Sequence, residues 1–206
     1  MKKLIKYIIY LLILLIVGYN SVYFKKLSDI NKLSTEKFNA ALFSKILWEE
    51  KMPQKVDSSI DFSQLKQAVN NNEADALKKH TNAMGIGNYR YALIKTKATV
   101  LSVYEDEVTI QLPGSDTATI ATEYIYGNAI RDASELVAIS DFPNTTELNS
   151  ISEELNKIVR TYVLTSFKKM VKKGQTLTII GAVELNKAHI KWNGLELLPV
   201  RIQIVN

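Results

Sequence analysis

An uninterrupted apolar stretch near the N-terminus constrains this chain more than any other feature of its sequence. Residues 7–24 read YIIYLLILLIVGYNSVYF and carry no charge. At about 1.5 Å rise per residue, about 18 helical residues span about 27 Å, just enough for the hydrocarbon core of a bilayer. Aromatic rings near both ends of the stretch suit the headgroup zone. We therefore predict a transmembrane anchor over residues 1–26, with residues 7–24 contacting the lipid bilayer.

The main rival to a retained anchor is a cleaved secretory signal peptide. Three lysines precede an apolar block of signal length, but Tyr19 stands where a cleavage site needs a small residue, so retention is favoured. Three lysines and the α-amine precede the stretch, whereas only Lys25 and Lys26 follow it, which favours a cytoplasmic N-terminus. We expect a single pass through the cytoplasmic (inner) membrane, with the domain facing the periplasm or the cell exterior.

The formal charge of +5 is concentrated in this N-terminal region. Residues 1–26 hold five lysines and no acid, so the remainder contains 21 basic and 21 acidic side chains. Binding through phosphate neutralisation requires a local cationic field, which an electrically balanced domain does not supply. We therefore expect no nucleic-acid partner.

The residue types that carry much of enzyme chemistry are scarce. Cysteine is absent, which excludes disulfides, thiolate nucleophiles and lipid attachment through sulfur. The two histidines, His80 and His189, lie outside any HxxH or HExxH spacing, so no metal site is expected. No GxSxG, Walker or GxGxxG motif occurs. The sequence favours a noncatalytic protein without a cofactor.

Residues 27–87 predict a helical stalk and subdomain. A first helix is expected over 35–51 and ends before Pro53; Asp61 should cap a second helix, and 73–80 should form a third. In the first helix Phe38, Leu42, Ile46 and the neighbours Phe43 and Leu47 keep the three-to-four spacing of a helix that packs on the domain.

Residues 88–206 predict an OB-like β-barrel, so the chain belongs to the α+β class. A long strand within 91–104 should bend across two sides of the barrel, and a turn at 113–116 should join the next two strands. A long helix over 145–173 is expected between strands three and four, as in an OB-fold. We expect Tyr124 and Tyr126 on one face of the third strand. The apolar stripe of the long helix should include Tyr162, Phe167 and Met170. Asn193-Gly194 predicts a hairpin turn.

A polar segment from Gly127 to Ser134 interrupts the pattern before the long helix. Arg131 beside Asp132 can bind a carboxylate or an array of sugar hydroxyls, because a guanidinium offers forked donors and a carboxylate accepts hydrogen bonds. A buried Arg–Asp pair also commonly satisfies the backbone of a loop, and this structural role is the favoured alternative. The candidate ligand-binding residues are Asn128, Arg131, Asp132 and Asn144.

Ordinary structural roles account for the other conspicuous polar and aromatic residues. Asn144 and several acids crowd the start of the predicted long helix, where capping and the macrodipole account for them. Trp48 and Trp192 can stack on sugars or bases, but core packing is favoured. Acids such as Glu153 do not by themselves identify a glycosidase, because their separation is not visible in sequence.

Four segments carry a resemblance to a known family: Trp48–Pro53, Gly127–Ala133, Phe142 with Asn144, and Leu155-Asn156. Over roughly residues 30–206 the chain resembles the DUF2291 family of predicted periplasmic lipoproteins. The resemblance implies an exported, membrane-attached protein of unknown activity with an OB-like region, linked to sugar-importing ABC transporters. No catalytic residue is carried over. The lipobox cysteine of the family is absent, so the transmembrane segment would replace the lipid as tether.

These observations favour a noncatalytic binding or accessory module of the bacterial envelope, with an envelope or transporter protein as partner. An OB-type nucleic-acid-binding protein is one alternative, against which the charge balance argues. A glycan-acting enzyme with paired acids is another.

Overall fold

The computed structural model of the chain describes residues 6–7, 10 and 38–205. Residues 39–205 form one compact unit. The predicted anchor over 7–24 lies outside the described residues except at Tyr7 and Tyr10, and the start of the predicted stalk lies outside them as well. Within the described part of the chain, no helix is both long and apolar enough to cross a bilayer.

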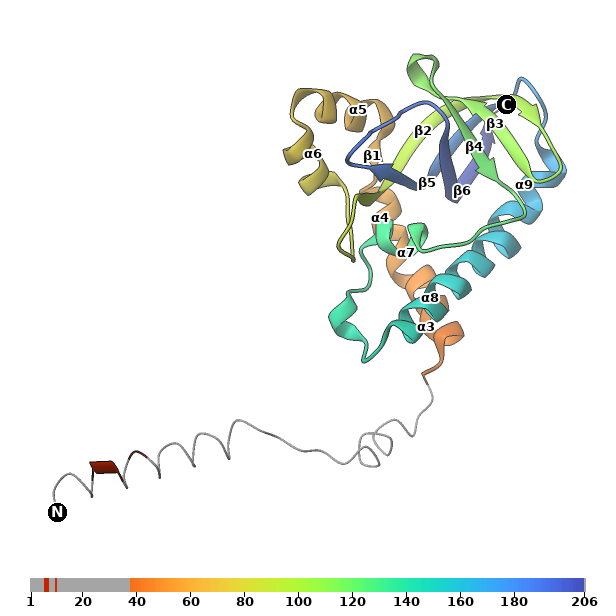
Figure 1. Cartoon of the computed structure of the whole chain (residues 1–206). Coiled ribbons are helices and arrows are strands. Elements are labelled where there is room, and N and C mark those ends of the chain that lie inside the picture. The colour runs from red at the N-terminus through yellow and green to blue at the C-terminus, as the bar shows by residue number, and fades with distance from the viewer. Residues whose placement is uncertain (1–5, 8–9, 11–37, 206) are drawn as a thin grey trace. The chain divides into compact units, whose positions relative to one another are not determined.

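Five strands close into a barrel (Figure 1). The strands are β2 (Tyr89–Val103), β3 (Glu107–Gln111), β4 (Thr117–Ala121), β5 (Thr176–Asn186) and β6 (Leu195–Val205). Antiparallel pairs join β2 to β3, β3 to β4, β5 to β6 and β2 to β5, and a short parallel pairing of β4 with β6 closes the barrel. This order is that of an OB-fold, so the predicted barrel is confirmed.

The longest strand, β2, serves two sides of the barrel, as predicted. Its first part pairs with β5 from Tyr89 to Thr99, and its last part pairs with β3 from Thr99 to Val103. The register shifts between Val100 and Ser102, and such an irregularity bends a strand. Apolar residues from all five strands fill the interior: Ile94, Ile110, Ile120, Leu177, Ile179 and Leu197 are fully buried.

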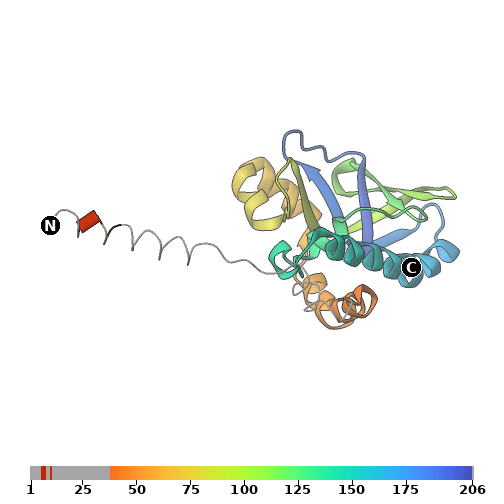
Figure 2. The same ribbon diagram turned by 60° about the horizontal axis from the view of Figure 1, so that its bottom comes forward.

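Helices lie against one end and one side of this barrel. The chain between β4 and β5 holds α7 (Ala129–Ser134), η3 (Ile139–Asp141), α8 (Thr145–Ile158), the π-helical η4 (Val159–Leu164) and α9 (Thr165–Met170). The run from α8 to α9 crosses one end of the barrel, and α3 (Ala40–Ile46) packs on α8 (Figures 1 and 2). A two-residue strand, β1 (Ile60–Asp61), pairs with β2, and next to it lie α5 (Phe62–Asn71) and α6 (Glu73–His80).

The predicted starts of the second and third helices are confirmed. The Asp61 carboxylate caps α5, because its Oδ1 accepts hydrogen bonds from the backbone N–H groups of Ser63 at 2.8 Å and Gln64 at 3.3 Å. The third predicted helix coincides with α6, and the side chain of Asn72 caps it.

The first helix differs from the prediction in its bounds and in its buried face. Pro53 does not end it: the π-helical η1 (Leu47–Lys51) leads into α4 (Met52–Asp57), and Pro53 lies in the first turn of α4. Leu42 and Ile46 are exposed, whereas Ser44 is buried and its Oγ donates to the carbonyl of Ile151 on α8 at 3.4 Å. The small serine allows a close helix approach, and this contact selects the buried face.

The predicted long helix contains a π-helical turn that changes which residues face the core. One i→i+5 turn inserts an extra residue, which rotates the following side chains by about 100° relative to an uninterrupted α-helix. Leu164 is therefore buried, whereas Tyr162 and Met170, predicted in the apolar stripe, are exposed. Phe167, predicted in the same stripe, is buried as expected.

Two expectations about the strand ends are wrong. Strand β4 ends at Ala121, so Tyr124 and Tyr126 lie in the following loop and are exposed. Asn193 and Gly194 do not make a two-residue hairpin, because β5 ends at Asn186. Instead the Asn193 Oδ1 accepts a hydrogen bond from the Thr117 N–H at 2.9 Å, which draws the start of β6 beside β4.

Candidate functional site

The chain that follows β4 forms a short loop, Ile125–Asn128, and then the buried helix α7. Five of the six residues of α7 are buried, among them the polar Arg131, Asp132 and Ser134. The helix ends at Glu135, which adopts a left-handed conformation with φ of 53°. The polar segment identified in the sequence therefore packs inside the fold.

Arg131 and Asp132 form a buried ion pair. Only 6% of Arg131 and 1% of Asp132 is exposed, and the Arg131 Nε donates to the Asp132 Oδ1 at 2.7 Å. The Arg131 Nη1 donates to the carbonyl of Leu148 on α8 at 3.0 Å. Charges this deeply buried are tolerated only when they are paired and hydrogen-bonded. The pair therefore fixes α7 against α8, and the structural role weighed for these residues is fulfilled.

A chain of hydrogen bonds extends from this pair into the barrel. The Asn128 Nδ2 donates to the Asp132 Oδ2, and the Asn128 Oδ1 accepts from the Tyr91 hydroxyl at 3.4 Å. Tyr91 faces Glu184 across the β2–β5 ladder and hydrogen-bonds its carboxylate. Burial raises the pKa of Tyr91 from 10.0 to about 12, and the hydrogen bond and charge of Glu184 and the charge of Asp132 add to this.

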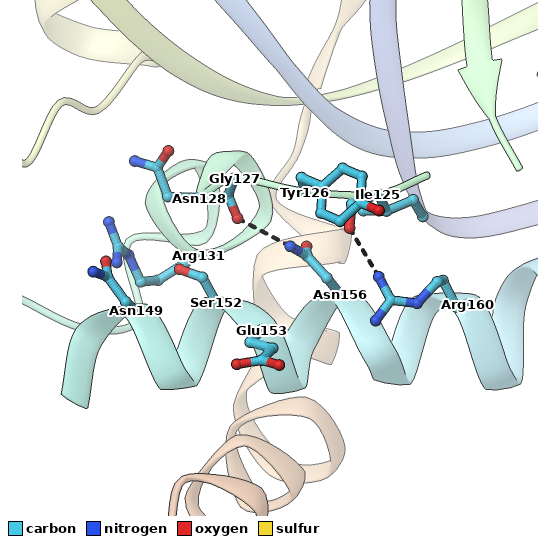
Figure 3. A pocket seen from close by; sticks show the side chains of 10 residues that line it. All are labelled: Ile125, Tyr126, Gly127, Asn128, Arg131, Asn149, Ser152, Glu153, Asn156 and Arg160. Atoms are coloured by element: carbon cyan, nitrogen blue, oxygen red, sulfur yellow. Dashed lines mark hydrogen bonds between the residues drawn. The ribbon is translucent and has the colours of Figure 1, made fainter. Parts of the chain in front are cut away.

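The first of two cavities beside this network lies between the loop and the helical run, and we call it the helix-side cavity. Its volume is about 540 Å³. Asn149, Ser152, Asn156 and Arg160 line it from α8 and η4, while Asn128 and Arg131 line it from the loop and α7 (Figure 3).

Two side chains of the helical run hold the loop above the helix-side cavity. The Asn156 Nδ2 donates to the Gly127 carbonyl at 2.9 Å, and the Arg160 Nη1 donates to the Ile125 carbonyl at 2.8 Å (Figure 3). Both carbonyls would otherwise need water, because they belong to a loop without a ladder partner. The loop is thus tied to the helix at two points.

The second cavity, the barrel-side cavity, also has a volume of about 540 Å³. Residues of β5, β6 and their connection line it, including Glu184, His189, Lys191 and Glu196, together with Tyr89 of β2. Residues 126–128 line both cavities. The loop therefore separates two polar cavities and contributes to each.

Exposed tyrosine rings stand at the mouths of these cavities. Tyr126 is 74% exposed and Tyr89 is 54% exposed, and both line the barrel-side cavity. Tyr124 stacks on Tyr126 with ring centroids 6.4 Å apart and an interplanar angle of 17°. A ring held at the surface by another ring offers an apolar face to a ligand, next to hydrogen-bonding groups in the cavity.

The structure brings together three of the four candidate residues. Asn128 and Arg131 line the helix-side cavity, and Asp132 lies behind them. Asn144 is exposed and instead caps α8, its Oδ1 accepting from the Glu147 N–H at 3.1 Å. Trp192 is half-buried and packs edge-to-face on the buried Phe62 with centroids 5.8 Å apart.

The sequence analysis missed Tyr91, Asn156, Arg160 and Glu184 as members of this site. One signal was present for the helix, because Asn149, Ser152, Asn156 and Arg160 follow helical spacing on the side that faces the loop. No local signal marked Tyr91 and Glu184, since their pairing depends on the register of two distant strands. Within the described residues, no group of three His, Asp or Glu side chains is arranged to hold a metal ion.

Comparison with known proteins assigns the family of this OB-fold chain. The family model titled predicted periplasmic lipoprotein (DUF2291) matches residues 12–203. This chain belongs to the DUF2291 family. The assignment confirms the resemblance noted in the sequence, and it agrees with a periplasmic, envelope-associated protein of unknown function.

A crystal structure supports the fold of this DUF2291 chain. It is that of an OB-fold protein from Thermotoga maritima, which shares 22% identity and superposes with a TM-score of 0.72. The match covers 82% of this chain and 100% of the other. At this identity the likeness concerns the fold alone. No curated protein matches the sequence.

Proposed function

We propose that this DUF2291 protein is a noncatalytic binding module of the bacterial envelope that holds a small saccharide at the loop Ile125–Asn128. The observation that carries the proposal is the meeting of two polar cavities at Asn128, beside the exposed ring of Tyr126. Sugars present hydroxyls on their edges and apolar C–H groups on their faces. Side-chain amides and an aromatic face meet both needs in one place.

The geometry supports binding by a preformed site. Asn128 is held on one side by Asp132 and on the other by Tyr91, so its amide is oriented before any ligand arrives. Groups that are already fixed lose little conformational entropy on binding. The amides of Asn149 and Asn156 and the carboxylates of Glu184 and Glu196 add both donors and acceptors.

The test is a binding measurement on the full chain in detergent. Isothermal titration with a panel of monosaccharides and disaccharides is expected to find a ligand, and Tyr126→Ala should weaken its binding by about fivefold to tenfold because a stacking face is lost. Asn144→Ala is the control. Asn144 caps α8, which lines the helix-side cavity, but Asn144 itself lies outside both cavities, so its loss should leave affinity unchanged. Absence of binding to every sugar, or equal loss in both variants, would contradict the proposal.

The tether and the partner belong to the same proposal. Lipid attachment of a periplasmic lipoprotein uses a cysteine, and this chain contains none. We infer that residues 7–24 hold the protein in the inner membrane instead. From that position the domain would present its ligand to an envelope or transporter protein, and a sugar importer is the partner to test by crosslinking in cells.

Nucleic-acid binding is the second candidate, favoured by one observation. Bases stack on exposed aromatic rings of OB-folds, and Tyr104, Tyr124 and Tyr126 are exposed. The equal numbers of acids and bases after residue 26 argue against it. Tight binding of single-stranded oligonucleotides that weakens steeply with salt would reverse this ranking.

A further inference from the structure

We propose that the ligand of this site is a saccharide with a single carboxylate, and that Arg160 binds this carboxylate in the helix-side cavity. The inference rests on the proposed function, because it names the ligand class of the same site.

Arg160 is a half-buried cation without a carboxylate partner. Its Nη1 donates to the Ile125 carbonyl at 2.8 Å, and it makes no ion pair with any acid in the part of the chain that the structure describes. A guanidinium carries five N–H donors, so one bond to the loop leaves an edge available to a ligand. Partial burial strengthens its interaction with an anion relative to a fully solvated arginine.

Three other cations of the same region have acidic partners. Arg131, the second arginine of the cavity, pairs with Asp132 at 2.7 Å. Along the helical run, Lys157 pairs with Glu154 at 3.4 Å and Lys168 with Glu123 at 2.6 Å. The sequence pointed to Arg131 as a carboxylate binder, but the structure commits Arg131 to Asp132. Arg160 therefore takes over that role.

The positions of these side chains define an orientation for the ligand. Asn156 and Arg160 both point toward the loop, whereas Arg131 and Asn149 lie at the other end of the helix-side cavity (Figure 3). A carboxylate at Arg160 places the sugar hydroxyls along Asn156 and Asn149. Tyr126 lines the same cavity and supplies the apolar face for the ring.

The charge count favours a monoanion over a phosphate. The one acid that lines the helix-side cavity is the exposed Glu153. A phosphate monoester carries nearly two negative charges, which would meet one uncompensated cation and one carboxylate. A carboxylate matches the fork of a single guanidinium and adds about one negative charge less than a phosphate monoester does.

The experiment compares sugars that share the glucose ring and differ in the group at C6. Isothermal titration of the full chain in detergent at low ionic strength is run with glucose, glucuronate and glucose 6-phosphate. We expect glucuronate to bind at least about tenfold more tightly than glucose, and this preference to shrink as salt screens the pair. Glucose 6-phosphate should bind more weakly than glucuronate.

Four variants connect the preference to Arg160. Arg160→Gln should remove the preference for glucuronate, so that the ratio of glucuronate affinity to glucose affinity measured in this variant falls to about one. Arg160→Lys keeps a positive charge and a hydrogen-bond donor for the loop. It should therefore retain part of the preference for glucuronate. Glu153→Gln should raise affinity for glucuronate alone, because a like charge is removed. Lys157→Gln, a control on the same helical run, should change neither sugar.

The outcomes separate this inference from the proposed function. Equal binding of glucose and glucuronate, or a preference that survives in Arg160→Gln, would overturn the carboxylate assignment while the saccharide site stands. Tighter binding of glucose 6-phosphate than of glucuronate would overturn the assignment of a singly charged ligand. If no sugar binds to the unaltered chain, the proposed function and this inference fail together.

Discussion

Asp132 accepts hydrogen bonds from two side chains at once, Arg131 and Asn128, with almost no exposure to solvent. Replacing it by asparagine keeps the shape but leaves the buried Arg131 charge unpaired. Breaking one side of a buried pair costs about 3 to 5 kcal/mol, so we expect Asp132→Asn to lower the free energy of unfolding by about 3 kcal/mol in urea titrations.

The matched control for that variant is an exposed ion pair nearby. Lys55 and Glu135 lie 3.2 Å apart at the surface, and Glu135→Gln should cost less than about 1 kcal/mol. If the two variants are equally stable, the Arg131–Asp132 pair does not anchor α7.

Tyr91 predicts a pH dependence of stability on the alkaline side. Its pKa is raised from 10.0 to about 12 in the folded protein, so the folded state holds this proton more tightly than the unfolded state. The resulting stabilisation is fully present below pH 10 and is lost as pH rises through about 12. Tyr91→Phe should remove this part of the alkaline loss, measured as the difference in unfolding midpoint between the two proteins across that window.

Tyrosinate absorbance gives an independent check on Tyr91. The unaltered chain should contain one tyrosine that ionises late, and the Tyr91→Phe chain should lack it. A late phase that persists in the variant would show that another tyrosine is responsible.

At the scale of single elements, closure of the barrel depends on a close approach of β5 and β6. A Cβ atom added at Gly181 would lie 2.6 Å from the Leu197 Cδ2 and 2.7 Å from the Leu198 carbonyl oxygen, where the β5–β6 register shifts. The carbonyl belongs to the backbone and has little room to move. We expect Gly181→Ala to destabilise the fold by about 2 kcal/mol or more in thermal or urea unfolding.

Gly85 provides the control for Gly181, because nothing lies within 4 Å of a Cβ added there. Gly85→Ala should be neutral or slightly stabilising, since it mainly restricts the unfolded chain. Similar losses in both variants would mean that the strand contact tolerates a methyl group.

Element by element, the sequence predicted the type of structure better than its orientation. Alternating apolar residues indicated the barrel strands, and Asp61 marked the start of α5, because such signals depend on neighbours along the chain. The solvent exposure of the Leu42 and Tyr162 side chains was not predictable from such local signals. Helix phase was decided by the contact of Ser44 with α8 and by the π-helical turn of η4.

For the whole molecule, the prediction concerns how the protein is held at the membrane. The full chain should remain in the membrane fraction after an alkaline carbonate wash and leave it only with detergent, because residues 7–24 are apolar and uncharged. A chain that lacks residues 1–26 should appear in the aqueous fraction as a folded protein with a cooperative thermal unfolding transition. Release of the full chain by carbonate alone would contradict a transmembrane tether.

Orientation is tested with the same two chains by protease digestion. In spheroplasts the domain should be digested without lysis if it faces the periplasm. Protection until the inner membrane is broken would place the domain on the cytoplasmic side.

The sequence by itself determined the class of this protein: an apolar N-terminal stretch, a charge-balanced remainder, and the strands and helices of an OB-like domain. It also pointed to Arg131 and Asp132, which are adjacent in the chain. Only the tertiary structure decided that this pair is internal, and that Arg160 and Glu184 each line a cavity beside Asn128. Local patterns reflect the preferences of neighbouring residues, whereas a site of this kind depends on strand register and helix phase, which are fixed when distant segments pack.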